Sequence, residues 1–245
     1  MAFPFELDEG NLVQFRGSSH HCRVTRCLFG PTSVGSPGSS KSPFVYMGDT
    51  TNHIRIDHCE MRNKANPGNS ILGDGNFDTF NPVRWIRIDH NYIHDISPEV
   101  DNEKEPIRLG VSTMSKKFSN SVIERNVFEA CICEPEIVST KACGVRVSGN
   151  TVLQSIGGLV VRHGTNSIMS DNYIIDGEAT FGDTIGSGGF RWYDADHTVS
   201  YNYVEGVYGG NFQGPMLLDT GDAEGSSSNL SAHWRVIGAM VERNV

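Results

Sequence analysis

Short stretches of alternating apolar and polar residues recur at eight places along the chain. Each has the form apolar-x-apolar-x-x-(Asn or Cys)-x-apolar, with small variations, as in segments 54–61, 86–93 and 145–152. Alternation over so few residues, with many β-branched side chains, is typical of a short strand, and no window keeps the 3.6-residue period of a helix. The pattern therefore predicts an all-β chain built from copies of one strand motif.

The polar position shared by the motifs defines a repeat. It recurs at intervals of 22 to 42 residues, at Cys27, Cys59, Asn91, Asn126, Asn150, Asn172, Asn202 and Asn244. Units this short cannot bury an apolar face alone, so they must stack on each other. We expect a right-handed parallel β-helix, with one coil per repeat and loops where the spacing is long. An antiparallel sandwich is the alternative, but it does not explain one motif placed eight times.

The recurring Asn also predicts a turn inside each coil. Asn tolerates left-handed backbone, and its amide can bond to the copies above and below it. No segment between repeats resembles an interdomain linker, so we expect residues 1–245 to form one solenoid domain. The first repeat begins almost at once and the chain stops inside the eighth, which predicts incomplete terminal caps, as in a fragment of a longer domain.

Composition and charge narrow the function. The chain of 245 residues is 38% hydrophobic and 20% charged, which is ordinary for a globular protein. No apolar run is long enough for a membrane-spanning helix, and the first residues do not form a signal peptide. With 20 Lys and Arg against 29 Asp and Glu, the net charge of −9 argues against nucleic acid as a partner. A polyanionic ligand would need a local basic patch.

The segment between the fourth and sixth motifs carries the candidate chemistry. Glu134 and Glu136 are two residues apart, so both carboxylates leave the same face of an extended chain and repel each other unless a cation such as Ca²⁺ lies between them. Lys141 and Arg162 precede the Asn of their own repeats by nine and ten residues. They therefore occupy almost the same place on consecutive rungs, about 4.8 Å apart. Each pair alone is also compatible with a solvated strand face; their coincidence on neighbouring coils indicates a site.

These residues resemble a known signature. Segment 134–141 (Glu-Pro-Glu-Ile-Val-Ser-Thr-Lys), followed by segment 158–164 (Gly-Leu-Val-Val-Arg-His-Gly), is similar to the signature of polysaccharide lyase family 6. That family contains alginate lyases and the dermatan/chondroitin B lyase. Segments 102–110 and 188–191 resemble two further motifs of the family. The family fold is a right-handed parallel β-helix, which agrees with the repeats.

The resemblance implies a role for each matching residue. Asn102, Glu134 and Glu136 match calcium ligands, Lys141 matches the Brønsted base, and Arg162 matches the Brønsted acid. The residues that match the lining of the sugar groove are His163, Arg191 and Lys64. The sequence departs from the pattern at Pro135, Thr140 and Ala142, without loss of a functional group.

The reaction implied is calcium-assisted β-elimination on a uronic acid polymer, either alginate or dermatan/chondroitin sulfate. The partner would be an anionic polysaccharide, the cofactor Ca²⁺, and the location outside the cell. Two other classes remain open. One is a non-catalytic or decayed β-helix that binds polysaccharide, and the other is a glycoside hydrolase or uronan epimerase on the same fold. Only a lyase leaves an unsaturated uronic acid at the new chain end.

Overall fold

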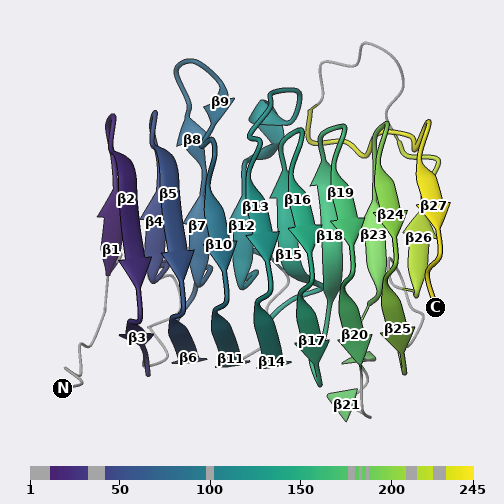
Figure 1. The fold of residues 1–245 in the computed structure, drawn as a ribbon, viewed down its shortest axis with the longest axis horizontal. Coiled ribbons are helices and arrows are strands. Elements are labelled where there is room, and N and C mark those ends of the chain that lie inside the picture. The colour runs from purple at the N-terminus through teal and green to yellow at the C-terminus, as the bar shows by residue number, and fades with distance from the viewer. Residues whose placement is uncertain are drawn as a thin grey trace.

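The strands form three long parallel sheets that run the length of the molecule (Figure 1). The computed structural model describes residues 12–32, 42–97, 102–175, 180–181, 184–185, 188–207, 214–222 and 230–245. Residues 1–11, where a cap before the first coil would lie, are outside the described residues. Successive strands along the chain belong to the first, second and third of these sheets (sheets A, B and C) and then start the next coil. The all-β parallel β-helix predicted from the repeats is therefore confirmed.

Every coil contributes one strand to sheets A and B, and the first seven contribute one to sheet C. Sheet A contains β1 (Val13–Phe15), β4 (Val45–Met47), β7 (Ile71–Gly73), β12 (Ile107–Leu109), β15 (Glu136–Lys141), β18 (Gly158–His163), β23 (Phe190–Trp192) and β26 (Met216–Leu218). Sheet B contains β2 (His20–Thr25), β5 (Asn52–Asp57), β10 (Arg87–Asp89), β13 (Val122–Glu124), β16 (Arg146–Ser148), β19 (Ile168–Ser170), β24 (Thr198–Ser200) and β27 (Met240–Glu242). Sheet C contains β3 (Leu28–Phe29), β6 (Glu60–Lys64), β11 (Tyr92–Ile96), β14 (Val127–Cys131), β17 (Thr151–Leu153), β20 (Tyr173–Ile175) and β25 (Tyr203–Glu205).

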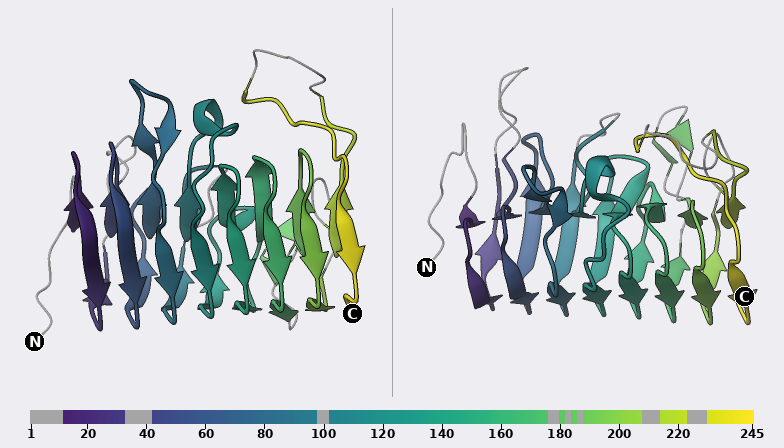
Figure 2. Two further views of the ribbon diagram at one scale, coloured as in Figure 1. Left: turned by 45° about the horizontal axis from the view of Figure 1, so that its top comes forward. Right: turned by 90° about the horizontal axis from the view of Figure 1, so that it is seen from above.

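The remaining elements lie outside the three sheets. They are the hairpin of β8 (Gly75–Asn76) and β9 (Asn81–Pro82), the short pair β21 (Thr180–Phe181) and β22 (Thr184–Ile185), and the 3₁₀ turn η1 (Ser112–Met114). The β8–β9 hairpin and η1 project from the same edge of the solenoid, as both views of Figure 2 show. Among the described residues, no helix is long and apolar enough to cross a membrane.

Each of the first seven motifs covers a strand of sheet B, a tight turn and the start of a strand of sheet C, and the eighth covers a strand of sheet B and the turn. Its apolar positions stack in register inside the solenoid; one such row is Ile56, Ile88, Ile123, Val147, Met169 and Val199, all buried. Rows of this kind remove apolar surface from water only when the coils are stacked. The repeat is therefore the unit of the core.

The recurring Asn residues form a ladder between sheets B and C. The side-chain Oδ1 of Asn150 accepts hydrogen bonds of 3.0 Å from both the backbone N and the Nδ2 of Asn126, and its Nδ2 donates to Asn172 and to the carbonyl of Ile123. The same arrangement links the Asn residues from Asn91 to Asn244. The predicted stacking of amides is confirmed.

The conformation expected for these Asn residues is wrong. The left-handed residue of each turn is the one before the ladder position: Arg26, His58, His90, Arg125, Gly149, Asp171, Tyr201 and Arg243. The residue before the Asn changes the direction of the chain at the turn. The Asn can therefore direct its side-chain amide between the coils. A left-handed conformation costs a non-glycine residue roughly 1–2 kcal/mol, and the buried amide hydrogen bonds offset this cost.

Loss of one rung of the ladder should destabilise the fold measurably. Asn150→Ala leaves the buried backbone N–H of Asn126 without its acceptor, so we expect the free energy of unfolding to fall by about 1–3 kcal/mol. Chemical denaturation of the variant measures this. Asn244→Ala, at the half-buried last rung, is the matched control and should cost less. Equal losses at the two positions would contradict a ladder that acts through buried amides.

A row of ion pairs on the outer face of sheet B predicts an acid-dependent term in stability. Asp57 is fully buried and accepts two hydrogen bonds of 2.6 Å from Arg23, which holds the pKa of the Asp57 carboxyl well below its usual range. Stability from such a group is present above the ordinary Asp pKa of about 3.9 and is lost as the pH falls through the lowered value.

Asp57→Asn should therefore lower the free energy of unfolding at neutral pH by about 1–2 kcal/mol, a modest amount because Arg23 is half exposed. The difference from the parent should shrink as the pH is lowered toward the folded pKa. Thermal unfolding of both proteins across the acid range measures it. A difference that stays constant with pH would exclude this carboxylate as its source.

Candidate active site

The candidate residues gather on the outer face of sheet A. Glu136 and Lys141 are the two ends of β15, Arg162 lies near the end of the adjacent strand β18, and Arg191 is the middle residue of β23. Because β15, β18 and β23 are consecutive strands of one parallel sheet, their outward side chains are separated by single rungs. The proximity of Lys141 and Arg162, predicted from their distances to the ladder, is present.

Two irregularities in the pairing of β15 with β18 set the direction of these side chains. The register shifts between Glu136 and Val138, and again between Thr140 and Lys141. Lys141 consequently pairs with His163, and Arg162 is an extra residue without a partner in the register. This extra residue explains why Lys141 precedes its ladder Asn by nine residues and Arg162 precedes its own by ten. Both Ile137 and Val138 enter the core. Bulges re-aim side chains in this way next to active sites.

These strands line a cavity of about 370 Å³. Its wall contains six of the eight residues predicted from the sequence: Asn102, Glu134, Glu136, Lys141, Arg162 and Arg191. The rest of the wall is formed by one residue of η1, the residue before β15 and two residues of the segment after 230, namely Ser112, Pro135, Ser231 and His233. The cavity thus brings together acids, a lysine and two arginines from several coils.

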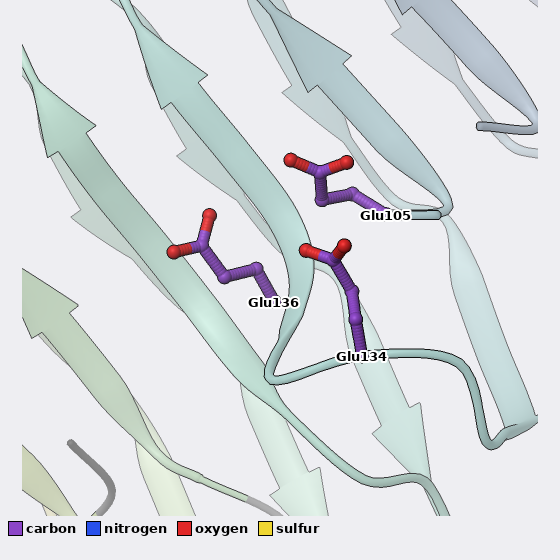
Figure 3. A group of neighbouring side chains, drawn as sticks. All are labelled: Glu105, Glu134 and Glu136. Atoms are coloured by element: carbon purple, nitrogen blue, oxygen red, sulfur yellow. The ribbon is translucent and has the colours of Figure 1, made fainter. Parts of the chain in front are cut away.

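Three carboxylates converge at one end of this group (Figure 3). Glu105 extends from the segment before β12, and Glu134 and Glu136 from the start of β15, with one oxygen of each within 4.8 Å of the others. All three side chains are buried. Burial and the neighbouring carboxylate of Glu105 raise the pKa of Glu134 above its usual range. The cluster is therefore unfavourable when all of its members are ionised and no cation is bound.

The donor set of this cluster fits a hard cation. Carboxylate oxygens are the ligands that Ca²⁺ prefers, and the Oε1 atom of Glu105 is buried without a hydrogen-bond partner among the described residues. Other oxygens are held in place: Glu105 Oε2 accepts from Asn69 at 2.6 Å, and Glu134 Oε2 accepts from the backbone N of Lys104 at 2.9 Å. Asn102 is exposed on the same cavity wall.

The two arginines are anchored to the acid cluster. Arg191 donates from Nη2 to Glu136 Oε1, and Arg162 Nε lies 3.9 Å from the same oxygen. The guanidinium of Arg162 also lies over the ring of Tyr193, 5.8 Å from its centroid. Burial lowers the pKa of Arg162, an effect that Glu136 opposes. Arginine nevertheless stays a cation in proteins, so Arg162 presents a fixed positive charge to the cavity.

Lys141 lies across the cluster from Arg191. Its side chain is 15% exposed and its Nζ is 3.9 Å from Glu105 Oε1. The bulge before Lys141 directs this amine into the cavity, next to Arg162 on the following rung. A basic amine, a cationic donor and a carboxylate cluster therefore share one small volume.

His163 does not line the cavity as the sequence predicts. It is fully buried, and burial together with the adjacent Arg162 lowers the pKa of its imidazole to about 2. A ring that stays neutral can accept a hydrogen bond, and its Nε2 lies 3.4 Å from Arg162 Nη1. The structure places His163 as a support beneath the guanidinium, because a bulge makes Arg162 rather than its neighbour the outward residue.

Lys64 is also misplaced by the sequence prediction. It belongs to sheet C, in register with the core residues Ile96 and Cys131, and is 0% exposed. Its ammonium donates to the carbonyl oxygens of Asn66 and Pro67 and to the Asn66 side chain, at 2.8–3.0 Å. Lys64 therefore fixes the loop that follows β6 and does not reach the groove.

Two residues of the site were missed. Ile107 and Val138 are register partners, and Glu105 and Glu136 each lie two residues before one of them. This equivalent position at the start of two neighbouring strands is the sequence feature that could have indicated Glu105. His233 lies in the longest interval between motifs, and no pattern in the sequence indicates it. Its ring stacks on Tyr193 at 4.3 Å, and its Nδ1 is 3.9 Å from Asp222.

Comparisons with known proteins agree with this architecture. A family model described as chondroitinase B matches residues 5–245. A mannuronic acid specific polysaccharide family 6 lyase from human gut microbiota is 28% identical, with a TM-score of 0.80 over 96% of this chain and 54% of its own. The PL6 family polysaccharide lyase Pedsa3628 from Pseudopedobacter saltans is 23% identical, with a TM-score of 0.72 over 96% of this chain and 55% of its own.

A third solved structure, alginate lyase AlyF-OU02 with G6, is 20% identical, with a TM-score of 0.63 over 84% of this chain and 46% of its own. At 23% and 20% identity, the last two support the fold alone. The chain spans about half the length of these solved proteins. No curated protein matches the chain.

Proposed function

The chain belongs to the chondroitinase B family, whose solved structural neighbours are polysaccharide lyases, and on this premise we propose that it cleaves a uronic acid polymer by β-elimination. The observation that carries the proposal is the shared cavity wall of Lys141, Arg162 and the carboxylates of Glu134 and Glu136. The mannuronic acid specificity of the 28% identical lyase favours alginate as the polymer.

Lys141 is the proposed base. Its amine, in the uncharged form, accepts the proton on C5 of the uronate, and the electron pair of that C–H bond forms the C4–C5 double bond as the C4–O4 bond breaks. Support comes from the position of Nζ in the cavity and from the bulge that aims it there. A positioned general base contributes roughly 10²–10⁴-fold to such a proton transfer.

Arg162 is proposed to act on the leaving oxygen. Negative charge develops on O4 as its bond to C4 breaks, and the guanidinium N–H groups can donate to it. Because arginine keeps its proton, the proton that completes the new hydroxyl is proposed to come from water held by Arg162. The hydroxide that remains then takes up the proton that Lys141 removed from C5, which restores the neutral amine. His163 and Tyr193 fix the guanidinium from below and from the side.

The carboxylates of Glu105, Glu134 and Glu136, with Asn102, are the proposed holders of a Ca²⁺ ion. Bound there, the ion would neutralise the carboxylate of the substrate and stabilise the charge that develops on it as the C5 proton leaves. The convergence of the three acids on one point suits a cation. A glycoside hydrolase instead needs two carboxyl groups that flank the scissile bond.

A panel of uronic acid polymers tests the proposal. Alginate rich in mannuronate, alginate rich in guluronate and dermatan sulfate would each be mixed with the chain in the presence of calcium, and near-UV absorbance would be followed. We expect absorbance to rise, fastest with mannuronate-rich alginate. Chain scission without absorbance would indicate a hydrolase, and binding without scission would indicate a non-catalytic protein.

Arg162→Ala should lower kcat by about 10²–10³-fold, the usual effect of removing one donor to a developing oxyanion. Arg162→Lys, which keeps the charge but not the planar donor, should recover part of that loss. Initial rates with a saturating polymer measure both. An alanine variant with the parental kcat would remove Arg162 from the reaction.

A further inference from the structure

A second cavity lies at the same edge of sheet A, toward the N-terminus. It has a volume of about 200 Å³, between the turn that follows β4 and the base of the β8–β9 hairpin. Sheet A places β4 three strands and β7 two strands from β15. Because Arg84 and Trp85 follow β7, the cavity lies two to three coil spacings, roughly 10–14 Å, from the coil of Lys141. Its wall combines an exposed Trp85 with Arg84, Thr51 and Asp49.

The aromatic part of this wall is Trp85, whose backbone has a left-handed conformation. Trp85 has a φ of 53° and stacks on His53, which stacks in turn on His21. At the same turn the later coils have Asn120, Gly144, Asn166, Asp196 and Gly238. Those residue types accept left-handed backbone, whereas a bulky aromatic residue there is an outlier. A tryptophan that is 46% exposed on the cavity wall and held by stacking on His53 is suited to contact a ligand.

The polar part of the wall has unused hydrogen-bonding capacity. Arg84 Nη2 donates to Asn81 Oδ1 at 2.7 Å, while Arg84 Nε has no partner among the described residues. Thr51 is 1% exposed, and its hydroxyl is also without a partner in the part of the chain that the structure describes. Asp49 accepts from the backbone N of Gly17 at 2.8 Å and pairs with Arg16 at 3.4 Å, which offsets its negative charge.

We infer that this second cavity is a distal carbohydrate-binding site, which holds a uronate ring of the polymer whose cleavage is proposed at Lys141. Trp85 packs against the C–H face of the pyranose, Arg84 pairs with the carboxylate, and the Thr and Asn groups contact hydroxyls. This inference rests on the proposed function, because it assumes the same class of polymer. Arg16 adds a positive charge beside this cavity: it pairs with Asp49, and its guanidinium lies over the ring of Tyr46, which faces outward on β4 of sheet A.

The experiment compares a long ligand with a short one. Binding of mannuronate-rich alginate and of an alginate disaccharide would be measured by calorimetry with calcium present, in a Lys141→Ala background that prevents cleavage. A site two to three coils away contributes only when the ligand reaches it. We expect Trp85→Ala and Arg84→Gln each to weaken binding of the polymer by about tenfold and to leave the Kd of the disaccharide unchanged.

Two controls separate this outcome from a loss of fold or of catalysis. Tyr173→Ala removes another exposed aromatic side chain, 51% exposed on sheet C, and should change neither Kd. A polymer Kd that is unchanged in both test variants would overturn the inference, as would an equal loss for polymer and disaccharide. Failure of the proposed function has a different signature, since it is seen as missing unsaturated product with Lys141 present and does not alter these Kd ratios.

Discussion

Replacement of Lys141 by alanine is expected to reduce the rate of polymer cleavage by about 10²–10⁴-fold, the contribution of a positioned general base. The amine is the one lysine nitrogen on the cavity wall among the described residues, and it adjoins the acid cluster at 3.9 Å from Glu105. Removing it leaves the C5 proton without an acceptor. Initial rates of near-UV absorbance with alginate measure the effect.

Two further variants show whether Lys141 acts as a base or only as a charge. Lys141→Arg keeps a cation in the cavity but cannot accept the proton, so it should be as inactive as Lys141→Ala. Lys117→Ala removes an exposed lysine from the loop after η1 and should retain parental activity. The assignment would be contradicted by an active Lys141→Arg variant, or by cleavage that persists in Lys141→Ala.

Removal of the metal is expected to have an effect of similar size. Three buried carboxylates within 4.8 Å repel one another unless a cation lies between them, and the uronate that enters the cavity adds another negative charge. We expect a chelator to abolish cleavage and added calcium to restore it. Glu134→Gln and Glu136→Gln should each weaken calcium binding by at least about tenfold in a calorimetric titration.

Glu129→Gln provides the control for these substitutions, because it removes a carboxylate from sheet C that contacts Tyr92. It should change neither calcium binding nor activity. If chelation left the rate of cleavage unchanged, the metal would have no part in the reaction. Loss of calcium binding in all three variants alike would show that the ion does not occupy the predicted cluster.

Much of the fold follows from one repeated pattern. The apolar positions that flank each ladder residue stack in register because every coil must bury them against the next, and the Asn amides fix the distance between coils. Local sequence and global packing therefore agree at this corner. Which residue takes the left-handed conformation depends on geometry between strands, and the pattern alone pointed to the wrong one.

The site was less fully predictable, because the direction of each side chain depends on the pairing between strands. The number of residues before the ladder position places Lys141 and Arg162 together, because both lie on equivalent strands of adjacent coils, β15 and β18. The residue spacing does not reveal the bulge that turns Arg162 outward and His163 inward. Lys64 has the charge of a groove residue, yet the left-handed Asn63 breaks the alternation of β6 and turns the Lys64 stem into the core.

Glu105 and His233 show a second limit. His233 depends on the path of a loop, because it lies in the long segment between β26 and β27 of the last coil. Glu105 lies in the segment that leads into β12, and its correspondence with Glu136 is seen only when the starts of the two strands are known. The repeat pattern therefore indicates site residues that lie on the regular strands but not those that lie on loops.

The structure of the chain ends formed during cleavage gives the most direct test of the central claim. Proton NMR of mannuronate-rich alginate treated with the parent chain and calcium would identify the new non-reducing end. We predict a uronate with a double bond between C4 and C5, absent when Lys141→Ala is used. A saturated non-reducing end would contradict the proposed elimination and with it the roles given to Lys141 and Arg162.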